Sequence, residues 1–445
     1  MAKKKGGDLT NRSLELQQLQ GLPLNTKIKL TQQRIREWVN EFGLDHVYIS
    51  FSGGKDSTVL LHLARQLYPE IKAVYSDTGL EYPEIRNFVF TFDNVDIVKP
   101  KINFKDVIKK YGYPVVSKET ANKLDLARSY LIKLINDKSV NVCNGGNDSD
   151  YQLSEVFRLS DINLEYVAQI LNDESRGDNR GHKCNNTLAR CLGLLTKDNN
   201  IQFGLDKSEM SKFNLSRWGG LLDAPFKVSD KCCSAMKKKP MKEYTKTTGK
   251  YGITAVMACE SRMRTMQWLR HGCNLYDAKL PVSNPMSFWT TEDVLLYAAI
   301  NNVKLCSVYG DIVTTDGSEI ILNGQDDKQI FDSERQCLTT TGCQRTGCCM
   351  CGFGLQFESR PNRLELIDRF SNKNIRDYIL RGGEFKRSGI WQPSANGLGY
   401  WFVLKYMNTY CGTNIYIPDY ERYESEYSND ITKAYLNDRN FIYRG

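Results

Sequence analysis

Residues 50–57, Ser-Phe-Ser-Gly-Gly-Lys-Asp-Ser, follow one short apolar run and precede another at 58–61. This order predicts a strand, a tight glycine turn and the first turn of a helix. Gly53 and Gly54 carry no Cβ, so the backbone can turn sharply and approach a ligand closely. The first free N–H groups of the helix then point at an anion, which the helix dipole also attracts. The segment therefore predicts a phosphate-binding loop.

The side chains of this loop suit a polyphosphate. Lys55 supplies a positive charge, and Ser52 and Ser57 supply hydroxyl donors. The pattern is not the P-loop of nucleoside triphosphatases, because no glycine stands four residues upstream of the glycine pair. A bare strand-to-helix turn is the alternative. Lys55 followed by Asp56 at this junction favours nucleotide binding instead.

A second polar turn follows the next apolar run. Residues 73–75 end at Ser-Asp-Thr-Gly, residues 76–79, before a new helix starts near Pro83. Ligands of open α/β sheets bind at the carboxyl ends of the strands, so Asp77 is expected to face the same crevice as the glycine loop. The alternative is a turn residue that caps the following helix.

The first 111 residues alternate between strand and helix patterns. In chain order, the predicted elements are strand 47–51, helix 57–67, strand 71–75, helix 83–92, strand 94–98 and helix 103–111. This alternation predicts an α/β fold with a doubly wound, mostly parallel sheet. An amphipathic helix at 31–42 precedes the sheet, with Thr31 as its expected cap and Gly43 as its stop.

The middle of the chain interrupts the alternation. Residues 117–138 have a helical pattern, whereas 143–218 are rich in Asn, Asp, Gly and Ser, which indicates an insertion. A strand at 251–257 resumes the sheet, and Thr290 with Asp293 predicts a capping box. The expected parts are a nucleotide-binding domain in two pieces, 1–142 and 225–300, an insertion at 143–224, and a C-terminal cysteine-cluster module at 301–445.

Composition predicts a large cytoplasmic protein. A chain of 445 residues with 41% hydrophobic residues can bury at least two cores. No apolar segment follows the basic first residues and no apolar run of about 18 residues occurs, so neither secretion nor membrane spanning is expected. Fourteen cysteines without a secretion signal indicate metal, cluster or redox chemistry in a reducing compartment. The net charge of +8 permits a polyanionic partner without requiring one.

Two cysteine motifs carry further chemistry. Cys232 and Cys233 are adjacent and precede the lysine run 237–239, which favours the thiolate form. Two buried small hydrophobes are the alternative for this pair. Cys348-x-x-Cys351 lies on a glycine-rich loop and has a spacing typical of metal ligands.

The second motif provides three ligands to one site, because Cys343 lies five residues before Cys348. A fourth ligand could be Cys337, or either cysteine of the pair at 232–233. Both tetrahedral Zn²⁺ and a [4Fe–4S] cluster accept four thiolates.

Two arginines follow the strand expected at 253–257. Arg262 and Arg264 would lie at its carboxyl end, where a guanidinium can contact phosphate or sulfate with two hydrogen bonds. Surface arginines at a helix start are the alternative, because charged side chains are usually solvated.

These motifs together resemble the phosphoadenosine-phosphosulfate (PAPS) reductase family within the PP-loop ATP-pyrophosphatase superfamily, also called adenine nucleotide alpha hydrolase-like or HUP-like. SFSGGKDS looks like the PP-loop, which holds the pyrophosphate leaving group while a substrate is adenylylated. The other similar segments are VYSDTGLEYPEI at 74–85, CCSAMKKKP at 232–240, ACESRMR at 258–264 and TGC…CMCGFG at 341–354. The resemblance covers about residues 45–120 and 220–355, and it favours [4Fe–4S] over Zn²⁺.

Two positions depart from the family pattern. Glu260 replaces a neutral amide, which disfavours a bound sulfate unless the carboxylate is paired. Cys349 stands where an apolar residue is expected, and its thiol is a candidate for persulfide chemistry.

The intact PP-loop bears on the reaction that the resemblance implies. Reductases of this family bind an already activated sulfonucleotide and have a degenerate loop, whereas enzymes that cleave ATP keep the lysine and aspartate. Lys55 and Asp56 are intact here, so ATP-dependent adenylylation coupled to sulfur transfer is expected. Lys55 would neutralise the pyrophosphate, Mg²⁺ would bridge its oxygens with help from Asp56 or Asp77, and the thiol cluster would deliver sulfur or electrons.

Two other functions stay open at this stage. A sulfonucleotide reductase would bind PAPS or adenosine phosphosulfate more tightly than ATP. A non-catalytic nucleic-acid-binding protein with a structural zinc module would show steep salt dependence and no turnover. An adenine nucleotide is the expected partner, a nucleic acid is one candidate sulfur acceptor, and the need for a protein partner is open.

Overall fold

The chain forms two compact units, each built from two segments that are distant in sequence. The first unit is Met1–Lys101 with Met236–Cys348, and the second is Ile102–Ala235 with Cys349–Gly445. The computed structural model describes residues 9–136, 157, 159–172, 181–315, 337–370 and 373–437. The turn-rich stretches at 144–150 and 176–180 lie outside the described residues. The domain boundaries that the sequence predicts after residues 142, 224 and 300 stay predictions.

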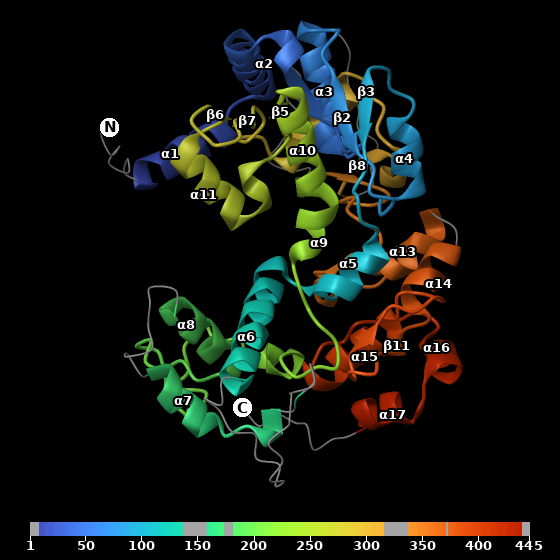
Figure 1. Ribbon diagram of the computed structural model, residues 1–445. Coiled ribbons are helices and arrows are strands. Elements are labelled where there is room, and N and C mark those ends of the chain that lie inside the picture. The colour runs from blue at the N-terminus through green and yellow to red at the C-terminus, as the bar shows by residue number, and fades with distance from the viewer. Residues whose placement is uncertain are drawn as a thin grey trace. The chain divides into compact units, whose positions relative to one another are not determined.

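A six-stranded sheet forms the centre of the first unit (Figure 1). Its strand order is β3-β2-β1-β5-β7-β6. All neighbouring strands are parallel except β6 and β7, which are antiparallel. The strands are β1 Val47–Ser50, β2 Ala73–Ser76, β3 Val95–Val98, β5 Tyr251–Ile253, β6 Asn274–Leu275 and β7 Val282–Ser283. The predicted α/β fold with a mostly parallel sheet is confirmed.

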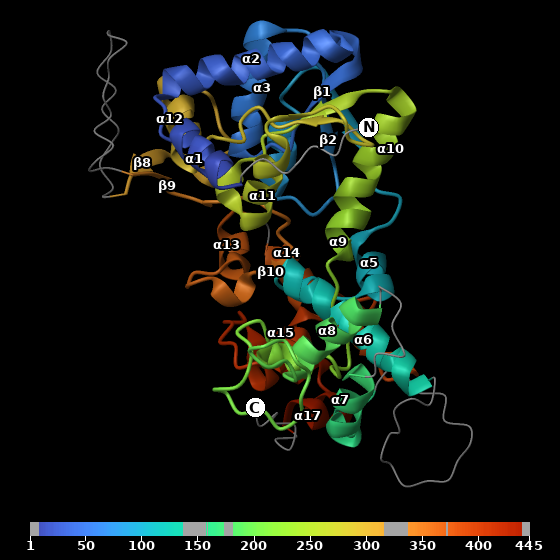
Figure 2. The same cartoon turned by 90° about the vertical axis from the view of Figure 1, so that its left-hand side faces the viewer.

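Helices cover both faces of this sheet. Tyr48 points to one face, where its hydroxyl lies 3.2 Å from Thr245 Oγ1 of α10. Val47 and Ile49 point to the other face, because side chains alternate along a strand. Figure 2 shows α2 and α3 on one side of β1 and β2, and α10 on the other. The helices of this unit include α1 Leu9–Gln20, α2 Leu24–Phe42, α3 Lys55–Leu67, α4 Pro83–Val89, α10 Lys239–Thr248, α11 Arg262–His271 and α12 Thr291–Ile300.

The strand order creates a switch point beside β1. From β1 the chain proceeds to β2 and β3 on one side, and it returns on the other side as β5. Connections that leave neighbouring strands in opposite directions open a crevice at the carboxyl ends of those strands. The glycine loop at 52–54 follows β1, so it lies at this crevice. An antiparallel pair of strands, β8 Ile312–Thr314 and β9 Leu338–Thr340, also belongs to this unit.

Two local predictions need correction. Helix α2 begins at Leu24 after Pro23, so Thr31 is not its cap. Thr31 is buried inside the helix, where its hydroxyl accepts from Trp289 Nε1 at 2.8 Å and donates to Pro285 O at 3.3 Å. Strand β5 ends at Ile253, short of the predicted 257, and a short 3₁₀-helix, η6 Ala258–Glu260, follows. Sequence periodicity could not reveal either feature, because tertiary hydrogen bonds and backbone turns decide them.

Other local predictions are confirmed. Gly43 ends α2 with φ 84° and donates its N–H to Val39 O. Thr290 and Asp293 form the expected capping box at the start of α12, with the Asp293 carboxylate accepting the Thr290 N–H at 2.7 Å. These features depend on a few neighbouring residues, so the sequence pattern is sufficient to predict them.

The second unit is mainly helical around an aromatic core. Its helices include α5 Phe104–Tyr111, α6 Lys118–Asn136, α7 Leu164–Asn172, α8 Gly181–Leu192, α9 Lys231–Cys233, α13 Arg363–Phe370, α14 Lys373–Leu380, α15 Tyr400–Tyr410, α16 Tyr420–Tyr427 and α17 Asp430–Asn437. Short strands pair as β4 Val115–Val116 with β10 Gly352–Phe353, and as β11 Glu384–Phe385 with β12 Trp391–Gln392. Trp391, Trp401 and Phe402 are buried at the centre of this core. No helix among the described residues is both long enough and apolar enough to cross a membrane.

A buried ion pair joins α2 to the start of α12. Lys27 Nζ lies 2.8 Å from Asp293 Oδ1 and 2.7 Å from Oδ2, and the Lys27 side chain is 3% exposed. Removal of one partner from a buried pair leaves the other charge uncompensated.

Lys27→Ala is therefore expected to lower the free energy of unfolding by about 3 kcal/mol, measured by urea denaturation. The control is Lys29→Ala, which removes an exposed lysine from the same helix. This control should change stability by less than about 0.5 kcal/mol. Equal losses in the two variants would mean that the ion pair is not what stabilises this junction.

Candidate functional site

The glycine turn between β1 and α3 has a geometry that only glycine fits. Gly53 has φ 71°, and a Cβ there would lie 2.7 Å from Val89 Cγ2 and 2.9 Å from Ile85 Cγ2 of α4. Gly54 caps α3, whose first residue is Lys55. The chain therefore turns tightly against α4, and the first turn of α3 starts at the carboxyl end of β1, in the predicted order of strand, turn and helix.

The two predicted serine donors hold the loop in shape. Ser57 Oγ donates to Gly54 O at 3.0 Å and accepts the Ser52 N–H at 3.1 Å. Ser52 Oγ lies 3.0 Å from Ser57 Oγ and accepts the Gly54 N–H at 3.3 Å. Ser57 is buried, whereas Ser52 is exposed. Ser57 therefore shapes the backbone, and Ser52 is the hydroxyl that a ligand can reach.

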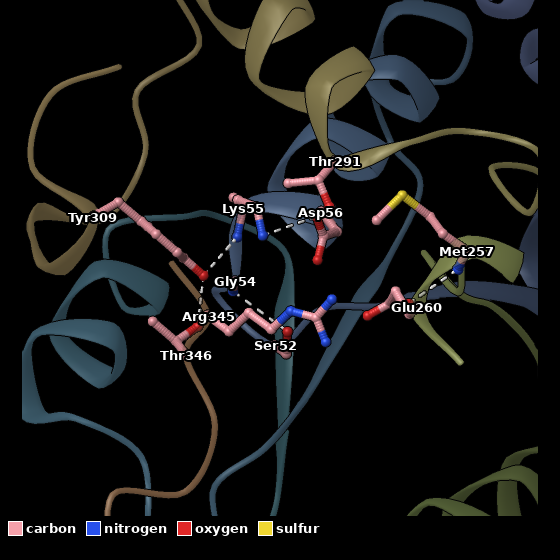
Figure 3. Close-up of a pocket in the computed structure, with 10 residues that line it drawn as sticks. All are labelled: Ser52, Gly54, Lys55, Asp56, Met257, Glu260, Thr291, Tyr309, Arg345 and Thr346. Carbon is pink, nitrogen blue, oxygen red and sulfur yellow. Dashed lines mark hydrogen bonds and ion pairs between the residues drawn. The ribbon is translucent and has the colours of Figure 1, made fainter. Parts of the chain in front are cut away.

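A cavity of about 120 Å³ opens over this loop (Figure 3). Its lining combines the glycine loop with four other segments of the first unit. The lining residues are Ser52, Gly54, Lys55, Asp56, Met257, Glu260, Thr291, Tyr309, Arg345 and Thr346. The first four are sequence-predicted site residues, and the other six are not.

Lys55 is the central cation of the cavity. It is buried, and its backbone N–H donates to Tyr309 Oη at 3.0 Å. Its Nζ donates to Gln344 O at 3.3 Å and lies 3.5 Å from Asp56 Oδ1. One carboxylate and one neutral carbonyl thus face the ammonium group. An anionic ligand would be a stronger partner than the carbonyl.

Asp56 offers an oxygen to a hard cation. Asp56 Oδ1 is buried, lies 3.5 Å from Lys55 Nζ and makes no hydrogen bond to the residues that the structure describes. Mg²⁺ is usually held by one or two carboxylates together with substrate phosphates, and it prefers oxygen ligands. A carboxylate oxygen beside the glycine loop, in weak contact with Lys55 Nζ, therefore fits a Mg²⁺ ion bound with a nucleotide.

Asp77 lies at the end of β2 and pairs with α4. Arg86 Nε donates to both carboxylate oxygens at 3.2 Å, and Arg86 Nη2 donates to Oδ2 at 3.1 Å. Helix α4 begins after Tyr82, so the alternative that Asp77 caps it is wrong. Asp77 is not among the described residues that line the cavity. Its expected catalytic role stays a prediction.

The arginine segment contributes a neutralised pair to the crevice. Glu260 lines the cavity, accepts the Met257 N–H at 3.2 Å and forms an ion pair with Arg264. This pairing removes the main objection to a carboxylate beside an anionic ligand. Burial lowers the pKa of Arg264, and the nearby charge of Arg345 lowers it further. Arg262 is exposed at the start of α11 and is not part of the described lining.

The predicted thiol ligands are divided between the two units. Cys343 is buried and Cys348 is half-buried in the first unit. Within that unit, Lys237 Nζ lies 3.0 Å from Glu81 Oε1 and hydrogen-bonds Cys348. Burial lowers the pKa of Lys237, but the charges of Cys348 and Glu81 outweigh burial and raise that pKa above its ordinary value.

The other predicted thiols belong to the second unit. Cys232 and Cys349 are buried, and Cys233 and Cys351 are half-buried. Burial raises the pKa of Cys351, and the nearby Cys233 raises it further. In the parts of the chain that the structure describes, no three Cys, His, Asp or Glu side chains form a group that could hold a metal ion. The ligand set, and the role of Cys349, stay predictions.

The residues that sequence reasoning missed come from distant segments. Arg345 and Thr346 lie between Cys343 and Cys348. The cysteine spacing there indicated a metal site, and nothing in the sequence indicated that this segment contacts the glycine loop. Tyr309 follows no motif. Its contact with Lys55 spans 254 residues of sequence, so local patterns contain no signal for it.

Comparison with known proteins gives a consistent family. Residues 46–135 match the phosphoadenosine phosphosulfate reductase domain. An uncharacterized protein of Methanocaldococcus jannaschii is 36% identical over 92 residues, which cover 19% of this chain and 22% of that protein. PAPS reductases of Xylella fastidiosa strains M23 and Temecula1 are each 37% identical over 68 residues, which cover 15% of this chain and 27% of each reductase. The chain thus spans 22–27% of the length of these relatives.

A solved structure is also similar in part. It is the PAPS reductase of Candida auris in complex with phosphate, with a TM-score of 0.30 and 14% sequence identity. The similarity covers 68% of this chain and 92% of that chain.

Gly53→Ala is expected to destabilise the protein more than Gly79→Ala. Both glycines have φ 71°, so both substitutions strain the backbone by about 1–2 kcal/mol. A Cβ at Gly79 meets no atom within 4 Å, whereas one at Gly53 meets α4. Overpacking should therefore cost Gly53→Ala about 1–3 kcal/mol more in urea unfolding. If both variants lost the same stability, packing against α4 would not be what demands glycine.

Proposed function

Because the chain belongs through residues 46–135 to the PAPS reductase family of the PP-loop superfamily, we propose that it is an enzyme that binds the phosphate groups of an adenine nucleotide at residues 52–57. The observation that carries the proposal is the environment of Lys55. Its buried ammonium group faces a small polar cavity at the start of α3, 3.5 Å from Asp56 Oδ1. Lysine, helix N-terminus and carboxylate are the groups that bind a polyphosphate with its metal ion.

The reaction that we favour is ATP-dependent adenylylation coupled to sulfur transfer. Loss of pyrophosphate leaves negative charge on the departing group, and a fixed cation stabilises this charge most effectively in a site with little water. Lys55 Nζ is placed to do this once it releases Gln344 O. Mg²⁺, held by Asp56 Oδ1 and the phosphates, would neutralise further charge.

A sulfonucleotide reductase is the second candidate. The curated relatives that carry an activity in their names are PAPS reductases. The Glu260 carboxylate is paired with Arg264, so it would repel a sulfate less than an isolated carboxylate would. The two candidates differ in the ligand they prefer and in whether pyrophosphate is released.

We also propose that cysteines 343, 348 and 351, with Cys232 or Cys233, hold a [4Fe–4S] cluster, and Zn²⁺ is the alternative. The support is the ligand spacing of the cysteines together with the family resemblance. A nucleic acid as sulfur acceptor belongs to the same proposal, with the net charge of +8 as its support. We assign no reaction step to the cluster.

Lys55→Ala should weaken ATP binding by about tenfold or more and abolish pyrophosphate release, because a hydrogen bond from a charged group contributes about 1.5–3 kcal/mol. Calorimetry with ATP and with PAPS, and an assay of released pyrophosphate, measure these effects. Lys72→Ala is the control, since Lys72 pairs with Asp96 outside the cavity. Unchanged affinity in Lys55→Ala would contradict the nucleotide site. Tight PAPS binding without pyrophosphate release from ATP would favour the reductase.

Protein prepared without oxygen should be brown and contain iron and sulfide, and Cys348→Ser and Cys351→Ser should each lose the iron. Cys184→Ser, a change in α8 outside the cysteine motifs, should keep it. Stoichiometric zinc without iron would overturn the cluster in favour of a structural zinc site. Full retention of iron in a Cys232→Ser, Cys233→Ser double variant would make Cys337 the fourth ligand.

A further inference from the structure

The phosphate-binding loop is closed by the chain's own groups. Tyr309 ends the 3₁₀-helix η7 Ser307–Tyr309 and is 2% exposed. Its hydroxyl oxygen accepts the Lys55 N–H at 3.0 Å. This N–H is one of the free donors at the start of α3, the group that would otherwise bind an anion. Figure 3 shows the Tyr309 hydroxyl directed at this N–H.

A second contact occupies the ammonium group of Lys55. Gln344 O accepts from Lys55 Nζ at 3.3 Å, and Thr346 Oγ1 lies 2.5 Å from Tyr309 Oη. Residues 344–346 and Tyr309 therefore bind both donor groups of Lys55. We call these residues the closing segment.

The closing segment is held in place by its own hydrogen bonds. Gln344 Nε2 donates to Thr339 Oγ1 and Thr340 O, each at 2.8 Å. The Gly342 N–H donates to Tyr309 O at 2.8 Å. These hydrogen bonds connect Tyr309 with residues 339–344, so the contact with the glycine loop does not depend on one isolated side chain.

The groups that close the loop are weaker acceptors than a phosphate. Burial raises the pKa of Tyr309 to about 12, so its hydroxyl is neutral at physiological pH. The carbonyl of Gln344 is also neutral. The dipole of α3 and the charge of Lys55 both favour an anion at this position. A phosphate oxygen would form charge-assisted hydrogen bonds with the same donors, which are about twice as strong as neutral ones.

Arg345 supplies a cation from the same segment. It lines the cavity, and Figure 3 shows its guanidinium group directed away from Tyr309, towards the side of Glu260. It forms no salt bridge in the part of the chain that the structure describes. Its charge also acts on Arg264 and Cys259. A guanidinium fork can bind two phosphate oxygens at once.

The size of the cavity points to displacement of the closing segment. Its volume of about 120 Å³ is below the roughly 300 Å³ at which pockets for small molecules begin. A nucleotide enclosed entirely in this cavity would therefore need more space than it provides. Withdrawal of the Tyr309 hydroxyl would both enlarge the cavity and free the Lys55 N–H.

We propose that Tyr309 is an internal competitor for the phosphate position and that Arg345 is a phosphate ligand. The inference rests on the proposed binding of a nucleotide at residues 52–57. The phosphate oxygen takes the Lys55 N–H from Tyr309 Oη. Gln344 O releases Lys55 Nζ to the phosphate group. The closing segment thus sets the nucleotide affinity of the loop.

The proposal predicts effects of opposite sign for two substitutions. Tyr309→Phe removes only the hydroxyl, so affinity for inorganic pyrophosphate and for ATP should rise about fivefold, the usual size of one neutral hydrogen bond. Arg345→Gln removes the charge and should lower both affinities about tenfold or more. Calorimetry of the full chain with each ligand measures these changes. Thr346→Val removes the hydrogen-bond partner of the Tyr309 hydroxyl, so it should also raise the affinity for both ligands.

Matched controls separate the cavity from general effects. Tyr297→Phe removes a hydroxyl that hydrogen-bonds His62 outside the cavity, and Arg36→Gln removes an exposed guanidinium from α2. Both should leave the two affinities unchanged. If Lys55→Ala abolished binding while Tyr309→Phe and Thr346→Val left it equal or weaker, Tyr309 would not be a competitor, although the proposed nucleotide site would stand. If neither ligand bound the wild type or any variant, both proposals would fall.

Discussion

The close packing of Gly53 against α4 is the constraint on which the site depends. A left-handed turn at this residue lets the chain leave β1 and begin α3 within four residues, with Ile85 and Val89 directly over its Cα hydrogens. A side chain at this position would separate the loop from α4 and tilt the first turn of α3. The N–H of Lys55 and its ammonium group would then no longer face the same cavity. The orientation of the donors that are proposed to bind phosphate depends on this one backbone position.

The charges of the first unit are arranged so that two cations face an anion-sized space. Asp77 pairs with Arg86 and Glu260 pairs with Arg264, so these acidic groups are compensated. Lys55 is balanced in part by Asp56, and Arg345 has no carboxylate partner in the described part of the chain. Such an imbalance of charge favours a negatively charged ligand. Polyphosphate is the ligand class that suits both this balance and the helix N-terminus.

The loop between Cys343 and Cys348 would link the proposed nucleotide site to the proposed thiol chemistry. Its residues 344–346 contact the glycine loop, and the cysteines at its two ends are candidate cluster ligands. Cys348 also hydrogen-bonds Lys237, which pairs with Glu81 near the end of β2. A ligand that displaces residues 344–346 would therefore act directly on a segment whose ends carry two thiols.

The sequence by itself determined the features that depend on neighbouring residues. The strand and helix alternation, the glycine turn, the stop at Gly43 and the capping box of Thr290 with Asp293 are all local, because backbone preferences and short-range hydrogen bonds define them. Only the tertiary structure decided which distant groups complete the site. Tyr309 and Gln344 contact Lys55 across 254 and 289 residues of sequence. The Thr31 hydroxyl accepts a hydrogen bond from Trp289 and does not cap its helix. Such contacts depend on how the connections between the strands bring distant segments together. No local sequence pattern predicts that arrangement.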